Sequence, residues 1–323
     1  MSNKKTIFPQ EFIDKYAKLL GSEWDKFLET IKQKQPKSAW VNANKLGASV
    51  VYEKLHEISR LEKPSSCDSK NSQTVNGNAK AFGLSEKDIG FKKYSFSNQA
   101  FEIEMEKPGD LEFFKHGKIS LQEKAAMLPV IALAPTKDDY VLDACAAPGM
   151  KTIQLSNLAG KVLAIDVNSE RIKSLVHNKG KYALQNVQVK RTDVRNVNEQ
   201  FDKIVLDAPC SSEGLVRKKR NALQGWNMGV VTRKAKLQKE LITHCFDLLK
   251  TGGEMVYATC SFAPEENEEV ILHLLKERNN AKIVPMHLEG IKIRENKLCK
   301  YCVRLYPQDN NTQQFFLAKI KKK

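Results

Sequence analysis

The sequence predicts an α/β fold with a doubly wound, mostly parallel sheet, preceded by a smaller α+β module. Three observations predict it. From residue 119 onward, short apolar runs of strand length alternate with longer segments of helical periodicity. Several of these runs end on an acidic residue, as at Asp166 and Asp207. Before residue 119 the order is different, with two helical segments followed by isolated strands.

The N-terminal module is expected over residues 1–118. Helical spacing of apolar residues predicts two helices within residues 8–35. AWVNANK reads as a strand, GASVVYEKLHEI as a helix and YSFSNQAFEIEM as strand again. Residues 62–80 are polar and poor in apolar side chains, which predicts a surface loop.

The larger domain is expected over residues 119–323. ISLQEKAAMLPVIAL, at residues 119–133, reads as a helix. Gly252 and Gly253 are expected to close the helix that precedes them. Strands are predicted at 139–147, 161–167, 187–194, 201–210, 254–260 and 313–320, and helices at 149–159, 169–183, 234–250 and 267–279.

Charge is the strongest feature of the composition. The chain has 323 residues and a formal net charge of +15. A long polyanion is the natural partner, and nucleic acid is therefore favoured over a lysine-rich surface without a partner. There is no apolar run of membrane-spanning length, and the N-terminal MSNKKTIFPQEF has no signal-peptide core. The seven cysteines are scattered, which argues against a disulfide framework and for a reducing, cytoplasmic location. We expect a monomer without metal or membrane association.

Two predicted strands end in turns that contain a cysteine. IVLDAPCSS carries Cys210, and VYATCS carries Cys260. One interpretation is packing, since a free cysteine behaves as a small hydrophobe. The other is chemistry, because ligands of doubly wound sheets bind outside the carboxyl ends of the strands.

The turn after the first strand of the sheet, LDACAAPGMKT, consists of small residues that let a ligand approach the backbone. It matches neither GxGxxG nor GxxxxGK[ST], so neither a dinucleotide site nor a phosphate-binding loop is indicated. Asp166 ends the second strand, where a carboxylate can bind ribose hydroxyls, and Asp193 ends the third, where an adenine edge would lie. These acids are also common in turns and caps. Together with the small-residue loop they favour an adenosine-containing cofactor.

CAAPGMKT, DAPCSSEG, and YATCS followed by PEENE resemble the signature segments of RNA cytosine-5 methyltransferases of the NSUN, RsmB and archaeal Trm4 type. The resemblance covers roughly residues 119–323. It implies a Rossmann-like class I methyltransferase domain, an RNA-recognition role for the N-terminal module, and S-adenosylmethionine as cofactor. The cofactor contacts that it implies are Cys145, Ala146, Ala147, Pro148, Gly149, Met150, Lys151, Asp166, Arg171, Asp193 and Asp207.

The chain departs from the family pattern at four positions. Trp40, in AWVNANK, stands where an arginine is usual. Met150 replaces a glycine or serine, while Gln308 and Gln314 replace a histidine and a glycine. The first departure concerns RNA contacts, and the others look peripheral to the chemistry.

Methylation at carbon 5 of cytosine needs a nucleophile, an acid and a base. A thiolate that adds to carbon 6 makes carbon 5 nucleophilic, which is covalent catalysis. Asp207 can assist at ring N3. Spacing alone does not say which cysteine attacks. The resemblance implies Cys260 as the nucleophile and Cys210 as the residue that helps release product, with the target base flipped out of its stack.

The expected substrate is tRNA, because DAPCSSEGLVRK and the compact chain look most like the archaeal tRNA enzymes. A ribosomal RNA enzyme of RsmB type is the alternative within this class. A non-catalytic RNA-binding or assembly factor is the alternative outside it, although RNA binding alone requires no second cysteine.

Other motifs are weaker. Cys299 and Cys302 form a single CxxC without the second ligand pair that structural zinc needs. Cys67 and Cys245 look incidental. The basic run Arg217–Arg220 is expected to contact the RNA backbone rather than to be only a solvated face. Trp226 could equally stack on a base or pack.

Overall fold

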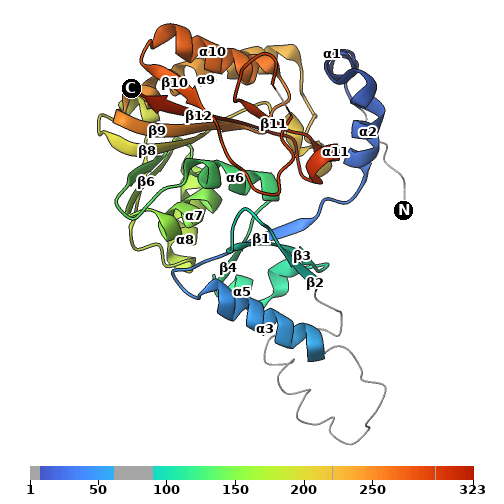
Figure 1. Cartoon of the computed structure of the whole chain (residues 1–323), viewed down its shortest axis with the longest axis vertical. Coiled ribbons are helices and arrows are strands. Elements are labelled where there is room, and N and C mark those ends of the chain that lie inside the picture. Colours follow the sequence, from blue (N-terminus) through green and yellow to red (C-terminus); the bar gives the residue numbers. More distant parts are fainter. Residues whose placement is uncertain (1–7, 62–89, 220, 295) are drawn as a thin grey trace, which may run out of the picture.

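The computed structural model describes residues 8–61, 90–219, 221–294 and 296–323 (Figure 1). The loop expected at residues 62–80 lies outside the described residues. Within them, no helix combines the length and the apolarity needed to cross a membrane.

The large domain is built on a mostly parallel sheet, as predicted. Its strands lie in the order β10-β12-β9-β8-β5-β6-β7, and β11 pairs with β12. The five strands from β9 to β7 run parallel to one another, whereas β12 is antiparallel to β9. The strands are β5 (Tyr140–Asp143), β6 (Lys161–Asp166), β7 (Val187–Arg191), β8 (Phe201–Asp207), β9 (Leu249–Thr259), β10 (Ala281–Val284), β11 (Val303–Leu305) and β12 (Phe315–Lys322).

Helices cover both faces of this sheet (Figure 1). Alternate strand residues point to opposite faces, so Val141 and Val205 join one core while Leu142 and Leu206 join the other. The first core also contains α6 (Lys124–Leu133), α7 (Met150–Leu158) and α8 (Ser169–Lys181). The second contains α9 (Met228–Asp247) and α10 (Glu268–Glu277). The shorter elements are η3 (Val194–Asn196), η4 (Glu213–Arg217), η5 (Pro264–Glu266) and α11 (Pro307–Asn310).

The small sheet has four antiparallel strands in the order β2-β3-β1-β4. They are β1 (Lys37–Val41), β2 (Gly90–Lys93), β3 (Ala100–Glu104) and β4 (Ile119–Leu121). The core of this sheet is formed with α3 (Ala48–Leu61) and α5 (Glu112–Lys115), which follows η2 (Pro108–Asp110).

Helices α1 (Gln10–Leu20) and α2 (Trp24–Lys32), joined by η1 (Gly21–Glu23), pack on loops of the large domain. Phe12, Tyr16 and Phe27 are fully buried there, in a cluster with Trp226 and Phe262. Residues 10–32 are therefore attached to the large domain and not to the small sheet.

Two local predictions were wrong. The helix predicted over 119–133 begins only at Lys124, because Ile119 pairs with Val41 as β4 and the Glu123 carboxylate caps α6. Gly252 and Gly253 do not close a helix. They lie within β9, where the pairing with β8 shifts register, and Gly252 has a φ of 81°, a conformation that glycine adopts readily.

Trp40, at the position of the family arginine, is a core residue with no exposed surface. Its indole N–H donates to Asn157 Oδ1 at 3.0 Å. Asn157 in turn donates to Asn42 Oδ1, and the Asn42 amide donates to the Tyr182 carbonyl. This chain of buried hydrogen bonds joins β1 to α7 and α8, and so fixes the small sheet against the large domain.

Candidate active site

A cavity of about 500 Å³ lies at the carboxyl ends of β5, β6, β8 and β9. This is where ligands of doubly wound sheets bind. Seven of the predicted site residues line it: Cys145, Asp166, Arg171, Asp193, Asp207, Cys210 and Cys260. Six others do not line it: Ala146, Ala147, Pro148, Gly149, Met150 and Lys151.

The loop after β5 is held close to the sheet by its small residues. The Ala146 N–H donates to the Ile165 carbonyl at 2.8 Å. Gly149 begins α7 with a φ of 107°, and a Cβ at this position would lie 2.6 Å from Leu175 Cδ1. Only glycine fits both constraints. Ala146, Ala147 and Gly149 thus determine how closely this loop lies against the sheet, although they do not line the cavity themselves.

Asp166 ends β6 and is 3% exposed. Its carboxylate accepts the Asn168 N–H at 2.9 Å and the Ala147 N–H at 3.2 Å, and Arg171 pairs with it at 3.2 Å. The Arg171 guanidinium also donates to the Ala147 carbonyl. Asp166 therefore holds the loop as well as facing the cavity.

Asp193 caps η3, and its carboxylate is bound by one neighbour. The Arg195 guanidinium donates to both carboxylate oxygens, at 3.0 and 2.8 Å, and the Arg195 N–H adds a bond at 2.9 Å. These hydrogen bonds lower the pKa of Asp193 below its usual range. Asp193 is consequently an acceptor at neutral pH, and each oxygen keeps lone-pair capacity for a ligand.

Asp207, the last residue of β8, forms an ion pair with Lys151. The Lys151 ammonium donates to Asp207 Oδ2 at 2.6 Å and is largely buried. Lys151 comes from the first turn of α7, so this ion pair joins the loop after β5 to the strand that leads to Cys210. Lys151 acts here through Asp207 rather than by lining the cavity.

The two strand-end cysteines meet. The Sγ atoms of Cys210 and Cys260 are 3.0 Å apart, and both side chains are partly exposed to the cavity. The hydrogen bond with Cys210 and, to a smaller extent, burial raise the pKa of Cys260 well above that of a free thiol. Before substrate binds, Cys260 is therefore a thiol and not a thiolate.

Two buried glutamates link the cysteine loops to each other. Glu213, three residues after Cys210, accepts the Phe262 N–H at 2.7 Å and the Ser261 hydroxyl at 2.9 Å. Glu266, beyond Cys260, accepts the Ser211 N–H at 3.0 Å and the Ser211 hydroxyl. Each loop thus supplies a carboxylate that the other loop binds. We call Glu213 and Glu266 the glutamate pair, and the sequence analysis did not identify it.

Asp143, the last residue of β5, was also missed. It is 1% exposed, its Oδ2 accepts the Thr152 hydroxyl at 2.7 Å, and its Oδ1 has no hydrogen-bond partner. Burial raises the pKa of Asp143 to about 7. The signal was present in the sequence, because Asp143 ends a strand just as Asp166 does.

The basic run Arg217–Arg220 is not a uniform RNA-facing patch. Arg217 is buried and donates to the carbonyls of Gln33, Lys34 and Thr312 and to Asn311 Oδ1. The prediction that Arg217 contacts RNA was wrong, because its guanidinium satisfies backbone groups between η4 and α2. Lys218 and Lys219 are exposed, and Arg220 lies outside the described residues.

Trp226 packs rather than stacks on a base. It is 6% exposed, and its indole N–H donates to Glu213 Oε1 at 2.6 Å.

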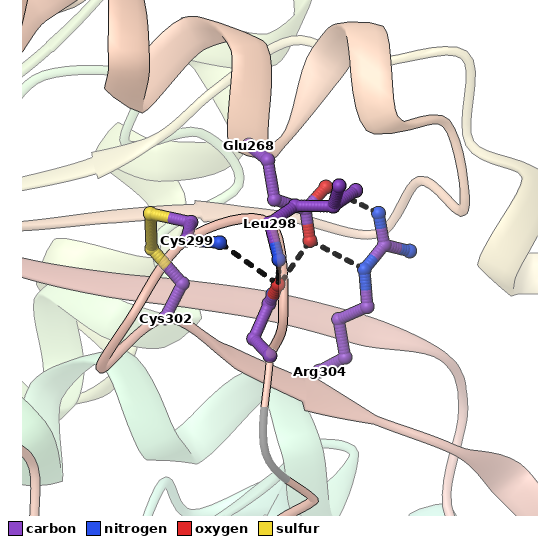
Figure 2. Close-up of a disulfide and its surroundings, with 6 residues drawn as sticks. Glu268, Leu298, Cys299, Cys302 and Arg304 are labelled. Atoms are coloured by element: carbon purple, nitrogen blue, oxygen red, sulfur yellow. Dashed lines mark hydrogen bonds and ion pairs between the residues drawn. A yellow bond between two sulfur atoms is a disulfide. The ribbon is translucent and has the colours of Figure 1, made fainter.

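Cys299 and Cys302 form a disulfide (Figure 2). Neither residue lines the cavity. The Cys299 N–H donates to Asn296 Oδ1, and the Asn296 amide donates to Glu268, which also pairs with Arg304. The composition gave no indication of this bond. It joins two cysteines three positions apart in the sequence and is a local link, not a framework.

Asp143 should make stability depend on pH. Its folded-state pKa of about 7 lies above the ordinary value of 3.8, so the folded chain keeps a proton that the unfolded chain has lost. This stabilisation is complete below about pH 4 and is lost as the pH rises through 7. Asp143→Asn should therefore gain about 2–3 kcal/mol over wild type between pH 5 and pH 8, measured by urea unfolding.

The exposed Asp138→Asn variant is the matched control and should follow wild type. An identical pH dependence in Asp143→Asn and wild type would show that Asp143 is ionised throughout.

Comparison with known proteins identifies the family of this chain. The model of the "16S rRNA methyltransferase RsmB/F" family matches residues 130–321. A human 28S rRNA (cytosine(4447)-C(5))-methyltransferase is 39% identical over 224 residues, which cover 64% of this chain and 28% of the relative. A tRNA (cytosine(49)-C(5))-methyltransferase of Pyrococcus abyssi is 35% identical over 231 residues, 66% of this chain and 73% of the relative.

Among solved structures, a methyltransferase homologue from Pyrococcus horikoshii is 27% identical, with a TM-score of 0.79, covering 98% of this chain and 96% of that one. This likeness confirms the Rossmann-like α/β fold. The chain spans less than half the length of several curated relatives, such as the human protein and the Psychromonas ingrahamii ribosomal RNA small subunit methyltransferase F. It belongs to the RsmB/F family, in which the human and Pyrococcus abyssi relatives are RNA cytosine-C5 methyltransferases.

Proposed function

We propose that this protein is an S-adenosylmethionine-dependent RNA (cytosine-5)-methyltransferase. The observation that carries the proposal is the pair of thiols of Cys210 and Cys260, 3.0 Å apart, in one cavity with Asp207. A non-catalytic RNA-binding factor would need neither thiol. It would also gain nothing from the glutamate pair, which leaves the two cysteine loops with few alternative positions.

Cys260 is the proposed nucleophile. Its thiolate forms a bond to carbon 6 of cytosine, and the electron pair of the 5,6 double bond becomes available at carbon 5. Asp207, held by Lys151, is proposed to deliver a proton or a hydrogen bond to ring N3 and thereby offsets the negative charge that develops in the ring. S-adenosylmethionine, when bound, supplies the methyl group. Cys210, as a thiolate, then takes the proton from carbon 5; the electron pair of that C–H bond re-forms the 5,6 double bond, and the bond from carbon 6 to the Cys260 sulfur breaks with its electrons returning to sulfur.

The cavity fits the adenosine part of the proposed cofactor. Asp166 and Asp193 offer carboxylate oxygens at the ends of β6 and β7, where ribose hydroxyls and an adenine amine need acceptors. Val167 and Val194 add apolar lining beside these acids. Arg171 is proposed to act mainly through Asp166, since its guanidinium is already bound to that carboxylate.

tRNA is the proposed substrate. The archaeal tRNA relative is covered over 73% of its length, whereas the human ribosomal RNA relative is covered over 28%. Ribosomal RNA is the second candidate, because the family model is named for 16S rRNA and the human relative has the higher identity, 39%. Bisulfite sequencing of total RNA from cells with and without the gene distinguishes them: a lost tRNA site supports tRNA, and a lost ribosomal site supports the second candidate.

A groove between the small sheet and the large domain is the proposed path of the RNA backbone. It has a volume of about 540 Å³ and is lined by Lys34, Lys37, Lys107 and Lys218, among others. Lys34, Lys107 and Lys218 are exposed. Lys37 donates to the carbonyls of Met105 and Glu106, so it is less available to phosphate.

The two cysteines should behave differently when each is replaced. Cys260→Ala should form no covalent bond to RNA and no product, because it lacks the nucleophile. Cys210→Ala should still attack and methylate, but should accumulate a protein–RNA adduct because release is slowed. Denaturing gels with labelled RNA and S-adenosylmethionine measure this.

The double variant should lose the adduct, and the buried Cys245→Ala control should behave as wild type. An adduct in Cys260→Ala would reverse the two roles. No adduct in either single variant, with activity lost only in proportion to folding, would reduce both cysteines to packing.

Asp166→Ala should weaken cofactor binding about tenfold or more, since a charged acceptor for the ribose is lost. The loss of its bonds to Ala147 and Asn168 adds to the effect by loosening the loop. Calorimetric titration of the folded variant with S-adenosylmethionine measures the change, and an unaltered affinity would contradict the assignment.

RNA affinity should fall steeply with salt, because lysine contacts release counterions from phosphates. Replacing Lys34, Lys107 and Lys218 by alanine should reduce the slope of log K against log salt by about 2–3. Lys161, Lys173 and Lys190 lie elsewhere on the large domain, and their triple replacement is a control of equal charge. Equal slopes for the two triple variants would exclude the groove as the path.

A further inference from the structure

Glu213 is a buried carboxylate that the proposed chemistry does not use. It is 0% exposed. Its Oε1 accepts the Tyr16 hydroxyl and the Trp226 indole N–H, each at 2.6 Å. Its Oε2 accepts the Ser261 hydroxyl at 2.9 Å and the Phe262 N–H at 2.7 Å. Four donors from three separate parts of the chain therefore converge on one carboxylate.

These donors determine where Glu213 can lie. Burying a carboxylate destabilises the folded state unless a cation or hydrogen-bond donors compensate its charge. Among the described residues, four hydrogen-bond donors provide this compensation for Glu213. The buried Glu268 differs, because it pairs with the Arg304 guanidinium. If one donor is lost, the Glu213 carboxylate shifts toward the remaining donors. Because those donors lie on separate loops, this shift also moves the loops.

The donors also connect distant segments. Tyr16 lies on α1, and Phe262 lies two residues after Cys260. Glu213 itself lies three residues after Cys210, and the Gly214 N–H next to it donates to the Cys260 carbonyl at 2.7 Å. The position of α1 is thus linked through one carboxylate to the two backbone segments that follow Cys210 and Cys260.

We propose that Glu213 is a positioning residue that makes the distance between the Cys210 and Cys260 thiols depend on the seating of α1. The inference rests on the proposed function, because it assigns a purpose to that thiol pair. Tyr16 is the contact from α1. Burial and the nearby carboxylate raise the pKa of Tyr16 above its usual value, so it remains a phenol and a donor throughout the physiological range.

Glu213→Gln is the decisive variant, because it keeps the shape but not the hydrogen bonds. An amide has one oxygen and one NH₂ group. Each carboxylate oxygen of Glu213 now faces an N–H donor, from Trp226 on one side and from Phe262 on the other. In either orientation the NH₂ of glutamine therefore meets an N–H that is left without an acceptor, and the hydroxyl beside it must turn from donor to acceptor.

Thiol labelling gives a readout that requires no RNA. The hydrogen bond with Cys210 and burial raise the pKa of the Cys260 thiol, which slows its alkylation in the wild type. When the loops separate, its labelling by iodoacetamide at pH 8 should rise about threefold or more. Cys245, 0% exposed on α9, reports global unfolding in the same sample. The ratio of labelled Cys260 to labelled Cys245, from peptide mass spectrometry, is the quantity to compare.

Glu213→Gln should raise this ratio, lower single-turnover methylation about tenfold or more, and leave the RNA Kd within about twofold. Tyr16→Phe should change the ratio and the methylation in the same direction by about threefold, and it serves as the test if Glu213→Gln does not fold. The matched control is Lys15→Ala, which removes a partly exposed α1 ion pair to Glu265 and should behave as wild type.

Three results would overturn the inference: labelling of Cys260 that rises only with that of Cys245, wild-type ratios in Tyr16→Phe, or an equal effect of Lys15→Ala. If the wild type methylates no cytosine in any RNA, the proposed function fails. The labelling ratios in the free protein still decide the role of Glu213.

Discussion

The parallel pairing of β8 with β9 is the constraint on which the site depends. Asp207 is in register with Ala258, and the Ala208 N–H donates to the Ala258 carbonyl at 2.9 Å. Two strands in this register leave the sheet at the same edge, so the turns that follow them must lie side by side. Cys210 lies three residues beyond the end of β8 and Cys260 one residue beyond the end of β9, and their sulfur atoms meet for this reason.

Beyond the strand ends, the backbone hydrogen bonds of the sheet no longer hold the chain in place. Hydrogen bonds from buried charged side chains hold the loops instead. The glutamate pair does this for the cysteine loops, Asp166 does it for the loop after β5, and Arg217 does it between η4 and α2. In each case a charged group is buried against backbone donors or acceptors. Such groups are costly to bury unless every bond is made, which leaves few alternative positions for the loops.

The sequence predicted what depends on local pattern. The alternation of strand-length and helical segments predicted the parallel sheet. The position of acids and cysteines at strand ends predicted that Asp166, Asp193, Asp207, Cys210 and Cys260 lie at one cavity. It did not predict partners that are distant in the chain. Arg217 and Trp226 look the same in sequence whether they face RNA or the core, and only the docking of α1 and α2 decides it. Ile119 was misassigned because a three-residue strand has too few residues to show alternation.

The burial that positions Cys260 also suppresses its reactivity. Its pKa is raised chiefly by the hydrogen bond with Cys210, so the geometry that brings the thiols together keeps the proposed nucleophile protonated. A ligand that separated the two sulfur atoms would remove this hydrogen bond and with it the largest contribution to the raised pKa. Thiolate would then form chiefly in the presence of that ligand. A resting thiol is protected by this arrangement, because a standing thiolate is the form that oxidants and alkylating agents attack.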